Sequence, residues 1–280
     1  MLVTLKELLK LPMAKETAVG AFNTPNTASL RAVIAAAEEA GEPVVIMHAQ
    51  LHEDLGICKM DEIAPLMLYF ADKASVPVCV HLDHGTDLDY IKRALELGFN
   101  SVMYDGSALD AKLNLANTCI ARELSLKYGA SLEAEVGSMG AREDGTPVKE
   151  GEGESVFTEP ETAKWFAENS GVDALTCAFG TVHGIYRSEP KLDFDRLGKI
   201  RDLVSVPLVM HGGSGVSVED FHRVISLGIR KVNYYTYMAK AGAAAVAAMK
   251  QPAYFHDIET EAVRAMTEDV LGAIRIFSGK

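Results

Sequence analysis

The sequence has no long apolar run and no excess of basic residues. No stretch of its 280 residues approaches the ~18 consecutive apolar residues of a membrane-spanning helix, and residues 1–7 lack the basic start and apolar centre of a secretion signal. Lysine and arginine total 27, against 39 aspartates and glutamates, for a net charge of -12. Nucleic acids and anionic membrane surfaces need a basic face. We therefore expect a cytoplasmic protein that binds neither, whereas an anionic small substrate is compatible with a locally positive site.

Cysteine pairs and interdomain linkers are also missing. The four cysteines show no Cys-x-x-Cys spacing, which favours free thiols over a metal-binding or redox motif; they are Cys58, Cys79, Cys119 and Cys177. The length suits two small domains or one large α/β barrel. No Pro/Gly/Ser-rich segment divides the chain, so we predict a single domain over 1–280.

Short apolar runs rich in β-branched residues alternate with amphipathic segments, a pattern typical of βα units and a parallel sheet. We predict eight strands, at 17–22, 44–47, 76–82, 101–104, 131–136, 174–179, 206–210 and 231–234. Each precedes a predicted helix, at 27–40, 61–73, 87–97, 111–128, 158–169, 194–203, 218–227 and 239–249. Eight such pairs in about 250 residues predict a (β/α)8 TIM barrel. Residues 252–280 are predicted to form a C-terminal helical extension.

A doubly wound open sheet is the competing architecture. It expects a phosphate-binding Gly-x-Gly-x-x-Gly turn after the first strand. This chain has Asn23-Thr24-Pro25-Asn26 at that point, and its glycine-rich turns come late in the sequence. The barrel is therefore favoured, and in a barrel the active-site residues lie on the loops that follow the strands.

Polar residues follow or end most of the predicted strands. They are Asn23, Asp83, His84, Asp105, Glu135, His183, His211 and Asn233. Because parallel strands end at the same rim of a barrel, we expect these side chains to converge there although they are scattered through the sequence.

Three of these residues are histidines at the ends of different strands. His183 and His211 are each followed directly by glycine, which lets backbone approach a ligand closely. Together with His84 they would offer three neutral imidazoles and leave an open fourth position, as in a catalytic Zn²⁺ site. His81 we interpret as a core residue that supports the site. The other histidines are interpreted as structural or solvated; they are His48, His52, His222 and His256.

The loops after the last two strands have the composition of a phosphate site. Residues 211–215 read His-Gly-Gly-Ser-Gly, and residues 233–236 read Asn-Tyr-Tyr-Thr. In TIM barrels these two loops commonly bind phosphate through backbone N–H groups and a helix N-terminus. A lone Gly-Gly-Ser-Gly turn would equally suit a flexible loop, but here it directly follows a candidate metal ligand.

These motifs together resemble the class II, metal-dependent ketose-bisphosphate aldolases of the fructose-bisphosphate and tagatose-bisphosphate type. The resemblance covers essentially the whole chain. It is carried by the segments 81–84 (His-Leu-Asp-His), 101–105 (Ser-Val-Met-Tyr-Asp), 133–137 (Glu-Ala-Glu-Val-Gly), 180–184 (Gly-Thr-Val-His-Gly) and 208–215, and by the pair Asn233 and Thr236.

The resemblance implies a reversible retro-aldol cleavage of a ketose 1-phosphate or 1,6-bisphosphate into dihydroxyacetone phosphate and an aldehyde. The three histidines would hold Zn²⁺, which stabilises an enediolate. Asp83 would exchange a proton with the hydroxyl at the carbon where the bond breaks, and Glu143 would be the acid/base at the enediolate carbon. Asp105 and Glu135 would form an alternative or second metal position. Substrate and its phosphate would bind at Asn23, Gly184, Gly212, Gly213, Ser214, Asn233 and Thr236, together with a monovalent cation such as Na⁺ or K⁺.

The resemblance also implies a small phosphorylated sugar as substrate and a homodimer or homotetramer. Glu143 lies in a polar loop, 137–155, that would close over the substrate, although Arg-Glu-Asp-Gly is also typical of any solvated loop. Aldolases that use a lysine Schiff base need a lysine at a strand end. The sixth strand contains none, and Lys231 is predicted to begin the eighth strand at the end far from the site, so the lysine route is disfavoured.

Two segments depart from the family pattern. After the eighth strand the family usually has acidic or small residues where this chain has Tyr234, Tyr235 and Tyr237, and residues 48–52 read His-Ala-Gln-Leu-His where small residues are usual. Both bear on the aldehyde half of the substrate, so we expect that half to differ from glyceraldehyde 3-phosphate. Two other interpretations stay open: a metal-dependent sugar-phosphate isomerase or epimerase, and a catalytically silent subunit of an aldolase complex.

Overall fold

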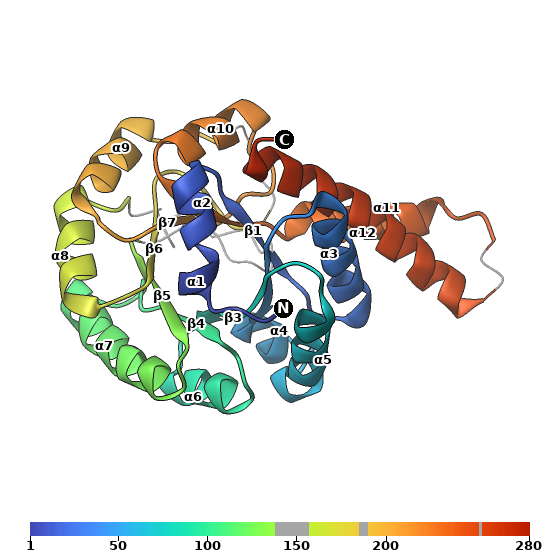
Figure 1. Cartoon of the computed structure of the whole chain (residues 1–280), viewed down its shortest axis with the longest axis horizontal. Coiled ribbons are helices and arrows are strands. Elements are labelled where there is room, and N and C mark those ends of the chain that lie inside the picture. Colours follow the sequence, from blue (N-terminus) through green and yellow to red (C-terminus); the bar gives the residue numbers. More distant parts are fainter. Residues whose placement is uncertain (138–156, 185–189, 252–253) are drawn as a thin grey trace.

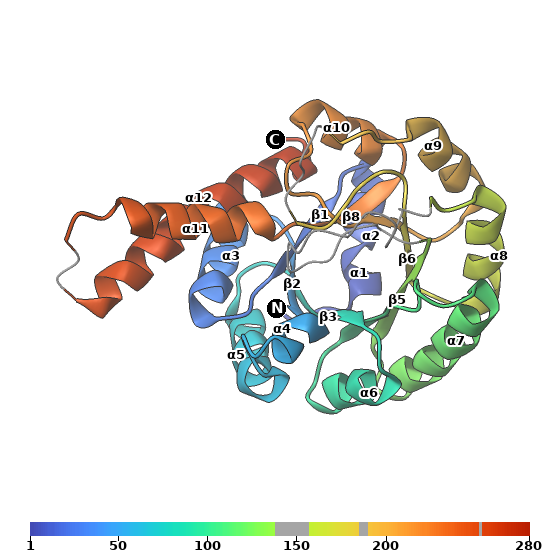
Figure 2. The same cartoon turned by 180° about the vertical axis from the view of Figure 1, so that it is seen from behind.

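The computed structural model describes residues 1–137, 157–184, 190–251 and 254–280. Within these ranges eight parallel strands pair in sequence order and close into a barrel, with β8 beside β1 (Figures 1 and 2). The strands are β1 (Val19–Asn23), β2 (Val44–Ala49), β3 (Val78–Gly85), β4 (Ser101–Tyr104), β5 (Ser131–Val136), β6 (Ala174–Cys177), β7 (Leu208–Met210) and β8 (Ile229–Asn233). The predicted TIM barrel is confirmed.

Two short helices precede the first strand, and the other helices, which follow the strands, surround the barrel. They are α1 (Leu5–Leu8), α2 (Lys10–Lys15), α3 (Thr27–Ala40), α4 (Gln50–Asp54), α5 (Met60–Lys73), α6 (Leu88–Glu96), α7 (Ala111–Lys127), α8 (Pro160–Ser170), α9 (Phe194–Leu203), α10 (Val218–Ser226), α11 (Thr236–Ala248) and α12 (Phe255–Ser278). Local sequence sets their ends. In α3, for example, the Asn26 side chain accepts the Ser29 N–H, and Gly41 closes the helix in the left-handed conformation.

The side chains inside the barrel are apolar at one end of its axis and polar or charged at the other. At the N-terminal mouth, α1 and the inward-facing residues of the strands form an apolar cluster of Leu5, Leu8, Leu9, Val19, Ala21, Val45, Met47, Cys79, Ala174 and Val209. Toward the C-terminal mouth, the inward-facing residues become polar and charged while staying buried; they include His81, Asp83, Glu133, Glu135, Thr176 and Lys231. The apolar layer closes one mouth, so the other is the one that can hold a substrate.

Two strand boundaries differ from the predicted ones in a way that bears on the site. β3 continues to Gly85, so His84 lies in the strand, and its pairing with β4 shifts register between Leu82 and Gly85. β8 begins at Ile229, because Ile229 pairs with Leu208 of β7. Lys231 is therefore in the middle of β8, and its predicted position at the far end of the strand was wrong.

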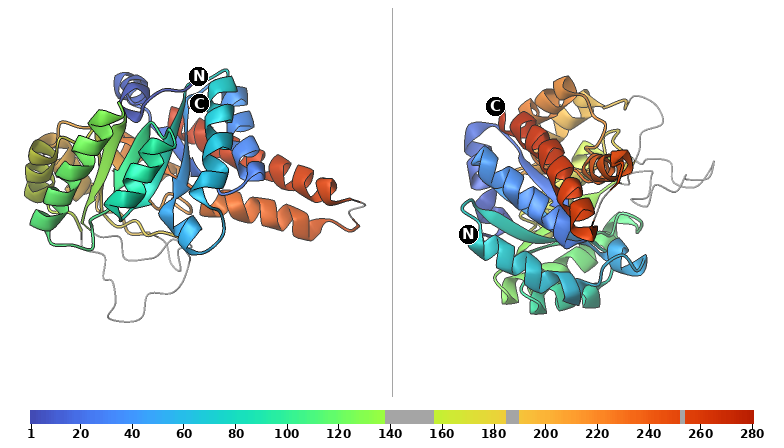
Figure 3. Two further views of the ribbon diagram at one scale, coloured as in Figure 1. Left: turned by 90° about the horizontal axis from the view of Figure 1, so that it is seen from below. Right: turned by 90° about the vertical axis from the view of Figure 1, so that its right-hand side faces the viewer.

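The C-terminal extension is helical, as predicted. The end of α12 packs on the barrel wall, where Phe277 contacts the rings of Phe221 and Tyr234 and its carbonyl accepts the N–H of Ala18 at 2.9 Å. The other end of α12 projects away from the barrel beside α11, as a two-helix arm (Figures 2 and 3). Among the described residues, no helix is both long and apolar enough to cross a membrane.

Candidate active site

Three imidazoles meet at the C-terminal mouth of the barrel. His84 ends β3, His183 follows β6 and His211 follows β7, and their ring centroids are 4.7 to 5.6 Å apart. One nitrogen from each ring lies within 4.8 Å of the others. We call these three residues the histidine triad. The structure thus brings together the three predicted metal ligands from distant parts of the chain.

Burial keeps two rings of the histidine triad in the neutral form that binds metal. It lowers the pKa of His183 to about 3 and also lowers the pKa of His211, although the hydrogen bond that His211 donates to Glu133 opposes the second shift. The Nε2 atom of His183 is buried and has no hydrogen-bond partner among the described residues. A buried nitrogen lone pair without a donor is costly unless a ligand occupies it, so the donor set suits a divalent metal such as Zn²⁺.

Neighbouring carboxylates orient two of these rings. His84 Nδ1 lies 2.7 Å from Asp105 Oδ2, and His211 Nε2 lies 2.9 Å from Glu133 Oε1. A neutral imidazole that donates its N–H to a carboxylate leaves its other nitrogen with a lone pair. His84 Nε2 and His211 Nδ1 are those other nitrogens, and they face each other at 2.9 Å. Both rings therefore present a lone pair to the same point.

His84 also has a strained backbone. Its φ is 45°, in the left-handed region that residues other than glycine seldom adopt, and the strain coincides with the register shift between β3 and β4. Such strain is typical of positions where function fixes a side chain.

Asp105 and Glu135 form a second group of potential ligands with His84. Ligand atoms of these three residues also lie within 4.8 Å of one another. Burial and the nearby Asp105 charge raise the pKa of Glu135 well above its ordinary value, and Glu135 Oε2 has no hydrogen-bond partner in the described part of the chain. A cation there would relieve this repulsion. Because the histidine triad shares His84, this group describes an alternative position close to the first.

Asp83 is next to His84 in the sequence, and each of its carboxylate oxygens accepts a hydrogen bond. Its side chain is fully buried, Asn23 Nδ2 donates to Oδ2 at 3.0 Å, and Asn233 Nδ2 donates to Oδ1 at 3.0 Å. Burial opposes its ionisation, but positive charge at His84 and at the buried Lys231 outweighs burial and lowers the pKa of Asp83. Asp83 is thus an oriented carboxylate that can accept a proton.

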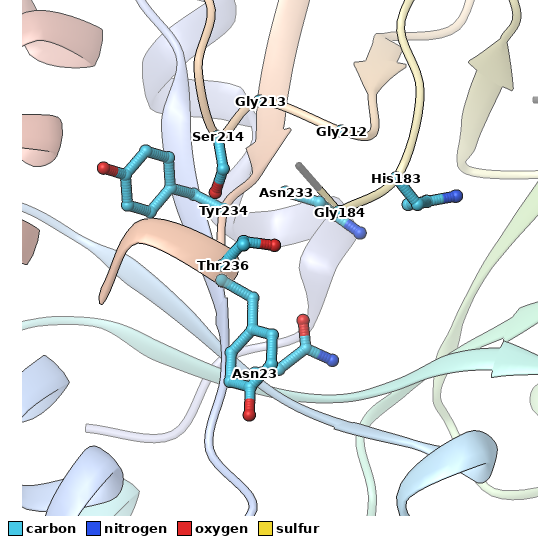
Figure 4. A pocket seen from close by; sticks show the side chains of 10 residues that line it. Asn23, His183, Gly184, Gly212, Gly213, Ser214, Asn233, Tyr234 and Thr236 are labelled. Atoms are coloured by element: carbon cyan, nitrogen blue, oxygen red, sulfur yellow. The ribbon is translucent and has the colours of Figure 1, made fainter. Parts of the chain in front are cut away.

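The predicted phosphate-binding residues line one pocket at this mouth, formed by the ends of β1 and β8 and the loops after β6, β7 and β8 (Figure 4). Its lining consists of Asn23, His183, Gly184, Gly212, Gly213, Ser214, Asn233, Tyr234, Tyr235 and Thr236. Thr236 is the first residue of α11, so the N-terminus of that helix faces the pocket, where it favours an anion. Gly212 has φ 69°, and a Cβ there would collide with the Val182 carbonyl, so glycine is required.

One predicted catalytic residue cannot be placed, and several site residues were missed. Glu143 lies outside the described residues. Glu133 and Lys231 are fully buried under the site, and His81, predicted to be a core residue, is buried there with its Nδ1 2.7 Å from Ser101 Oγ. A signal for them exists in the sequence. Each residue lies two positions before a predicted site residue on the same strand, and side chains two apart on a strand share a face.

A second cluster consists of aromatic rings from β2, α4, α6 and the loop after β8. It consists of His48, His52, Tyr90 and Tyr235, and we call it the aromatic cluster. The ring of His52 is 5.6 Å from Tyr235 and 6.0 Å from His48. His48 Nε2 lies 3.0 Å from the hydroxyl of Tyr90. The two segments that depart from the family pattern, 48–52 and 234–237, therefore contact each other.

Glu53 and Arg93 stabilise the aromatic cluster through hydrogen bonds that connect to Tyr90. The Tyr90 hydroxyl donates to Glu53 Oε2 at 2.9 Å, and Arg93 Nη1 donates to Glu53 Oε1 at 3.0 Å. Because Tyr90 donates its proton to Glu53, His48 must be the donor to Tyr90. Burial keeps the pKa of His48 low, at about 4, so the ring is neutral. The hydrogen bonds thus hold Tyr90 and an uncharged His48 in place, while Tyr235 of the same cluster lines the pocket.

Comparison with known proteins agrees with this geometry. The family described as class-II fructose-bisphosphate aldolase matches residues 3–280. A sulfofructosephosphate aldolase of Alkalicoccus urumqiensis and a fructose-bisphosphate aldolase of Geobacillus stearothermophilus are each 38% identical, with 84% of this chain and 81% of each relative covered. The crystal structure of the YdjI aldolase from Escherichia coli K12 superposes with a TM-score of 0.88 at 36% identity, over 99% of this chain and 97% of that one.

Proposed function

This chain belongs to the class-II fructose-bisphosphate aldolase family and is an aldolase, a carbon–carbon lyase, and we propose that it cleaves a ketose 1-phosphate or 1,6-bisphosphate reversibly into dihydroxyacetone phosphate and an aldehyde. The observation that carries the proposal is the histidine triad, in which carboxylates turn two imidazole lone pairs toward one point. We propose Zn²⁺ as the metal held there, with Asp105 and Glu135 as its alternative position. The metal would polarise the substrate carbonyl and stabilise the enediolate that bond cleavage produces.

Asp83 is proposed as the group that removes the hydroxyl proton at the carbon where the bond breaks. The two amide donors, from Asn23 and Asn233, aim its carboxylate, and nearby positive charge, from His84 first, lowers its pKa so that it stays ionised. In the condensation direction the same carboxyl would return the proton to the new hydroxyl. Glu143 is proposed as the acid/base at the enediolate carbon; this role rests on the family resemblance alone.

The substrate phosphate is proposed to bind in the pocket between β7 and β8. The N–H group of Thr236 and the hydroxyl of Ser214 would contact it, and Gly184, Gly212, Gly213 and Asn233 complete the wall. A monovalent cation, Na⁺ or K⁺, would offset the charge of the phosphate in this acidic protein.

The aromatic cluster is proposed to receive the aldehyde half of the substrate. Its neutral rings have no positive charge with which to hold a second phosphate. Two relatives at the same identity carry different substrate names, sulfofructosephosphate and fructose-bisphosphate, so identity of this degree does not fix the aldehyde half. We therefore propose an aldehyde other than glyceraldehyde 3-phosphate.

The two-helix arm of α11 and α12 is proposed to take part in a homodimer or homotetramer. Tyr254 and Phe255, at the projecting end of the arm, are 67% and 81% exposed. Exposed aromatic side chains of this size are typical of contact surfaces. Light scattering after gel filtration should give the mass of two or four chains, and a 30.2 kDa monomer would contradict the proposal.

The cleavage reaction is tested with a panel of ketose 1-phosphates and 1,6-bisphosphates. The Zn²⁺-loaded protein is incubated with each, and release of dihydroxyacetone phosphate is measured with and without a chelator. At least one substrate should release it, and the chelator should stop the release. Conversion of a substrate to an isomer without cleavage would identify an isomerase instead, and no reaction with any substrate would support the silent-subunit interpretation.

A further inference from the structure

Lys231 lies in the middle of β8, and its side chain is completely buried inside the barrel. Its Nζ donates a hydrogen bond to Asn233 Oδ1 at 2.7 Å. It also forms an ion pair with Glu133 Oε2 at 3.0 Å. A buried ammonium group is costly unless it is paired, so its presence calls for an explanation.

The orientation of Asn233 depends on this lysine. An asparagine side chain can present either its oxygen or its NH2 group to a neighbour. Asn233 presents NH2 to Asp83 Oδ1, because its oxygen is bound by Lys231. The reversed amide would place its oxygen against the ionised carboxylate and its NH2 group against the ammonium, and both contacts are repulsive. Lys231 thus leaves one orientation favourable.

Glu133 extends the same network to the metal side. Its Oε2 pairs with Lys231, and its Oε1 accepts hydrogen bonds from Thr176 at 2.8 Å and from His211 Nε2 at 2.9 Å. Burial opposes the charge of Glu133, but Lys231 and His211 hold its pKa well below the ordinary value. One buried ion pair therefore connects the residue that orients His211 to the residue that orients Asp83.

We propose that Lys231 is a positioning residue for the aldol reaction: through the amide of Asn233 it aims the carboxylate of Asp83 at the substrate hydroxyl, while Glu133 balances its charge. This inference rests on the proposed function. Its rival is that Lys231 forms an imine with the substrate carbonyl. The side chain of Lys231 is fully buried, and its Nζ is engaged by Asn233 and Glu133; both observations argue against that rival.

The test measures the effect of Lys231→Met in a Glu133→Gln background, because the double variant leaves neither buried charge without its partner. Lys231→Met alone leaves Glu133 buried without a partner and can prevent folding. We therefore place it in Glu133→Gln, whose amide oxygen can still accept from His211 and Thr176. Relative to Glu133→Gln at saturating Zn²⁺, kcat for release of dihydroxyacetone phosphate should fall about 10-fold to 100-fold, because a small misplacement of a catalytic group costs this much. KM and the Zn²⁺ affinity, measured by competition with a chelating dye, should change less than about twofold.

Asn233→Ala in the same background separates positioning from general damage. If Lys231 acts through the Asn233 amide, the kcat losses of the two substitutions should be far from additive, because the second change removes what the first has already lost. Additive losses would contradict the proposal. Val209→Ala is the matched control, since Val209 is buried and pairs with Lys231 in the β-ladder. It should lower the melting temperature and leave kcat unchanged.

Borohydride treatment during turnover distinguishes the rival role. Reduction traps an imine as a stable secondary amine, so mass spectrometry of the treated protein should find Lys231 unmodified. An adduct on Lys231, or an unchanged kcat on its substitution by Met, would overturn the positioning role. Failure of the wild-type protein to cleave any substrate would instead overturn the proposed function.

Discussion

Histidines form the whole of the histidine triad and half of the aromatic cluster, but their side chains contact different partners in the two places. On the metal side, His84 and His211 each contact a carboxylate, Asp105 or Glu133, which fixes one nitrogen and leaves the other as a ligand. In the aromatic cluster, His48 contacts a tyrosine hydroxyl and His52 packs against Tyr235. The comparison shows that the hydrogen-bond partner of a histidine, more than the residue type, distinguishes a potential metal ligand from a histidine that packs among aromatic rings.

The largest expected effect comes from removing a metal-side ring. His84→Ala should lower metal affinity by more than about 100-fold, since even loss of an orienting partner costs 10-fold to 100-fold. Cleavage should be lost with the metal. Zinc content after dialysis and release of dihydroxyacetone phosphate measure the two effects. The control is His222→Ala, which changes an exposed histidine of α10 and should affect neither. Full metal content in the His84 variant would place the metal elsewhere.

Asp83→Ala should separate metal binding from proton transfer. Asp83 is not a member of the histidine triad, so the variant should keep its metal. Loss of a positioned base commonly costs about 10²-fold to 10⁴-fold in rate, and kcat for cleavage should fall within that range. Zinc content and kcat are measured on the same preparation. If the variant cleaved at the wild-type rate, the role assigned to Asp83 would be wrong.

A smaller effect is expected on the aromatic side. His52→Ala removes the ring that packs on Tyr235 and leaves space beside that tyrosine, which lines the pocket. In the condensation direction, with dihydroxyacetone phosphate saturating, the ratio of kcat/KM for two aldehydes of different length should change about 10-fold, a typical value for altered pocket contacts. Zinc content should be unchanged. An equal loss for every aldehyde would show that His52 is not a specificity residue.

The smallest effect is a pH dependence of stability that originates at His48. Its pKa is about 4 in the folded protein, mainly because burial disfavours the charged ring, and about 6.5 when unfolded. The unfolded chain therefore takes up the proton first, and His48 reduces stability as the pH falls from 6.5 to 4, by up to about 3 kcal/mol. His48→Gln should make the unfolding free energy, from urea titrations, less dependent on pH in that window. An unchanged slope would contradict the low pKa.

The sequence predicted the barrel and the convergence of its polar rim because both follow from one-dimensional patterns. Alternating strands and helices define the barrel, and all strands end at one rim. The convergence of His84, His183 and His211 was therefore predictable from the sequence. The buried network below the site has no such pattern, because a charged residue in a strand suggests an exposed end and nothing in the sequence pairs Lys231 with Glu133. Only the closed barrel shows that they face each other inside it.

The contact between the two segments that depart from the family pattern also could not be predicted from the sequence. Residues 48–52 and 234–237 are far apart in the chain and follow strands that are not neighbours in the barrel, since β1 lies between β2 and β8. The ring contact of His52 with Tyr235 depends on how α4 and the loop after β8 turn over the end of β1. Neither turn has a pattern that specifies its direction.

The most direct test of the central claim is hydrogen exchange on dihydroxyacetone phosphate, because it requires no knowledge of the aldehyde. The Zn²⁺-loaded protein is mixed with dihydroxyacetone phosphate in D2O, and proton NMR follows the hydroxymethyl carbon next to the carbonyl. We predict that one of its two protons is replaced by deuterium, that a chelator stops the exchange and that added Zn²⁺ restores it. Exchange that continues at the same rate in the chelated protein, or no exchange in the loaded protein, would contradict a metal-dependent aldolase.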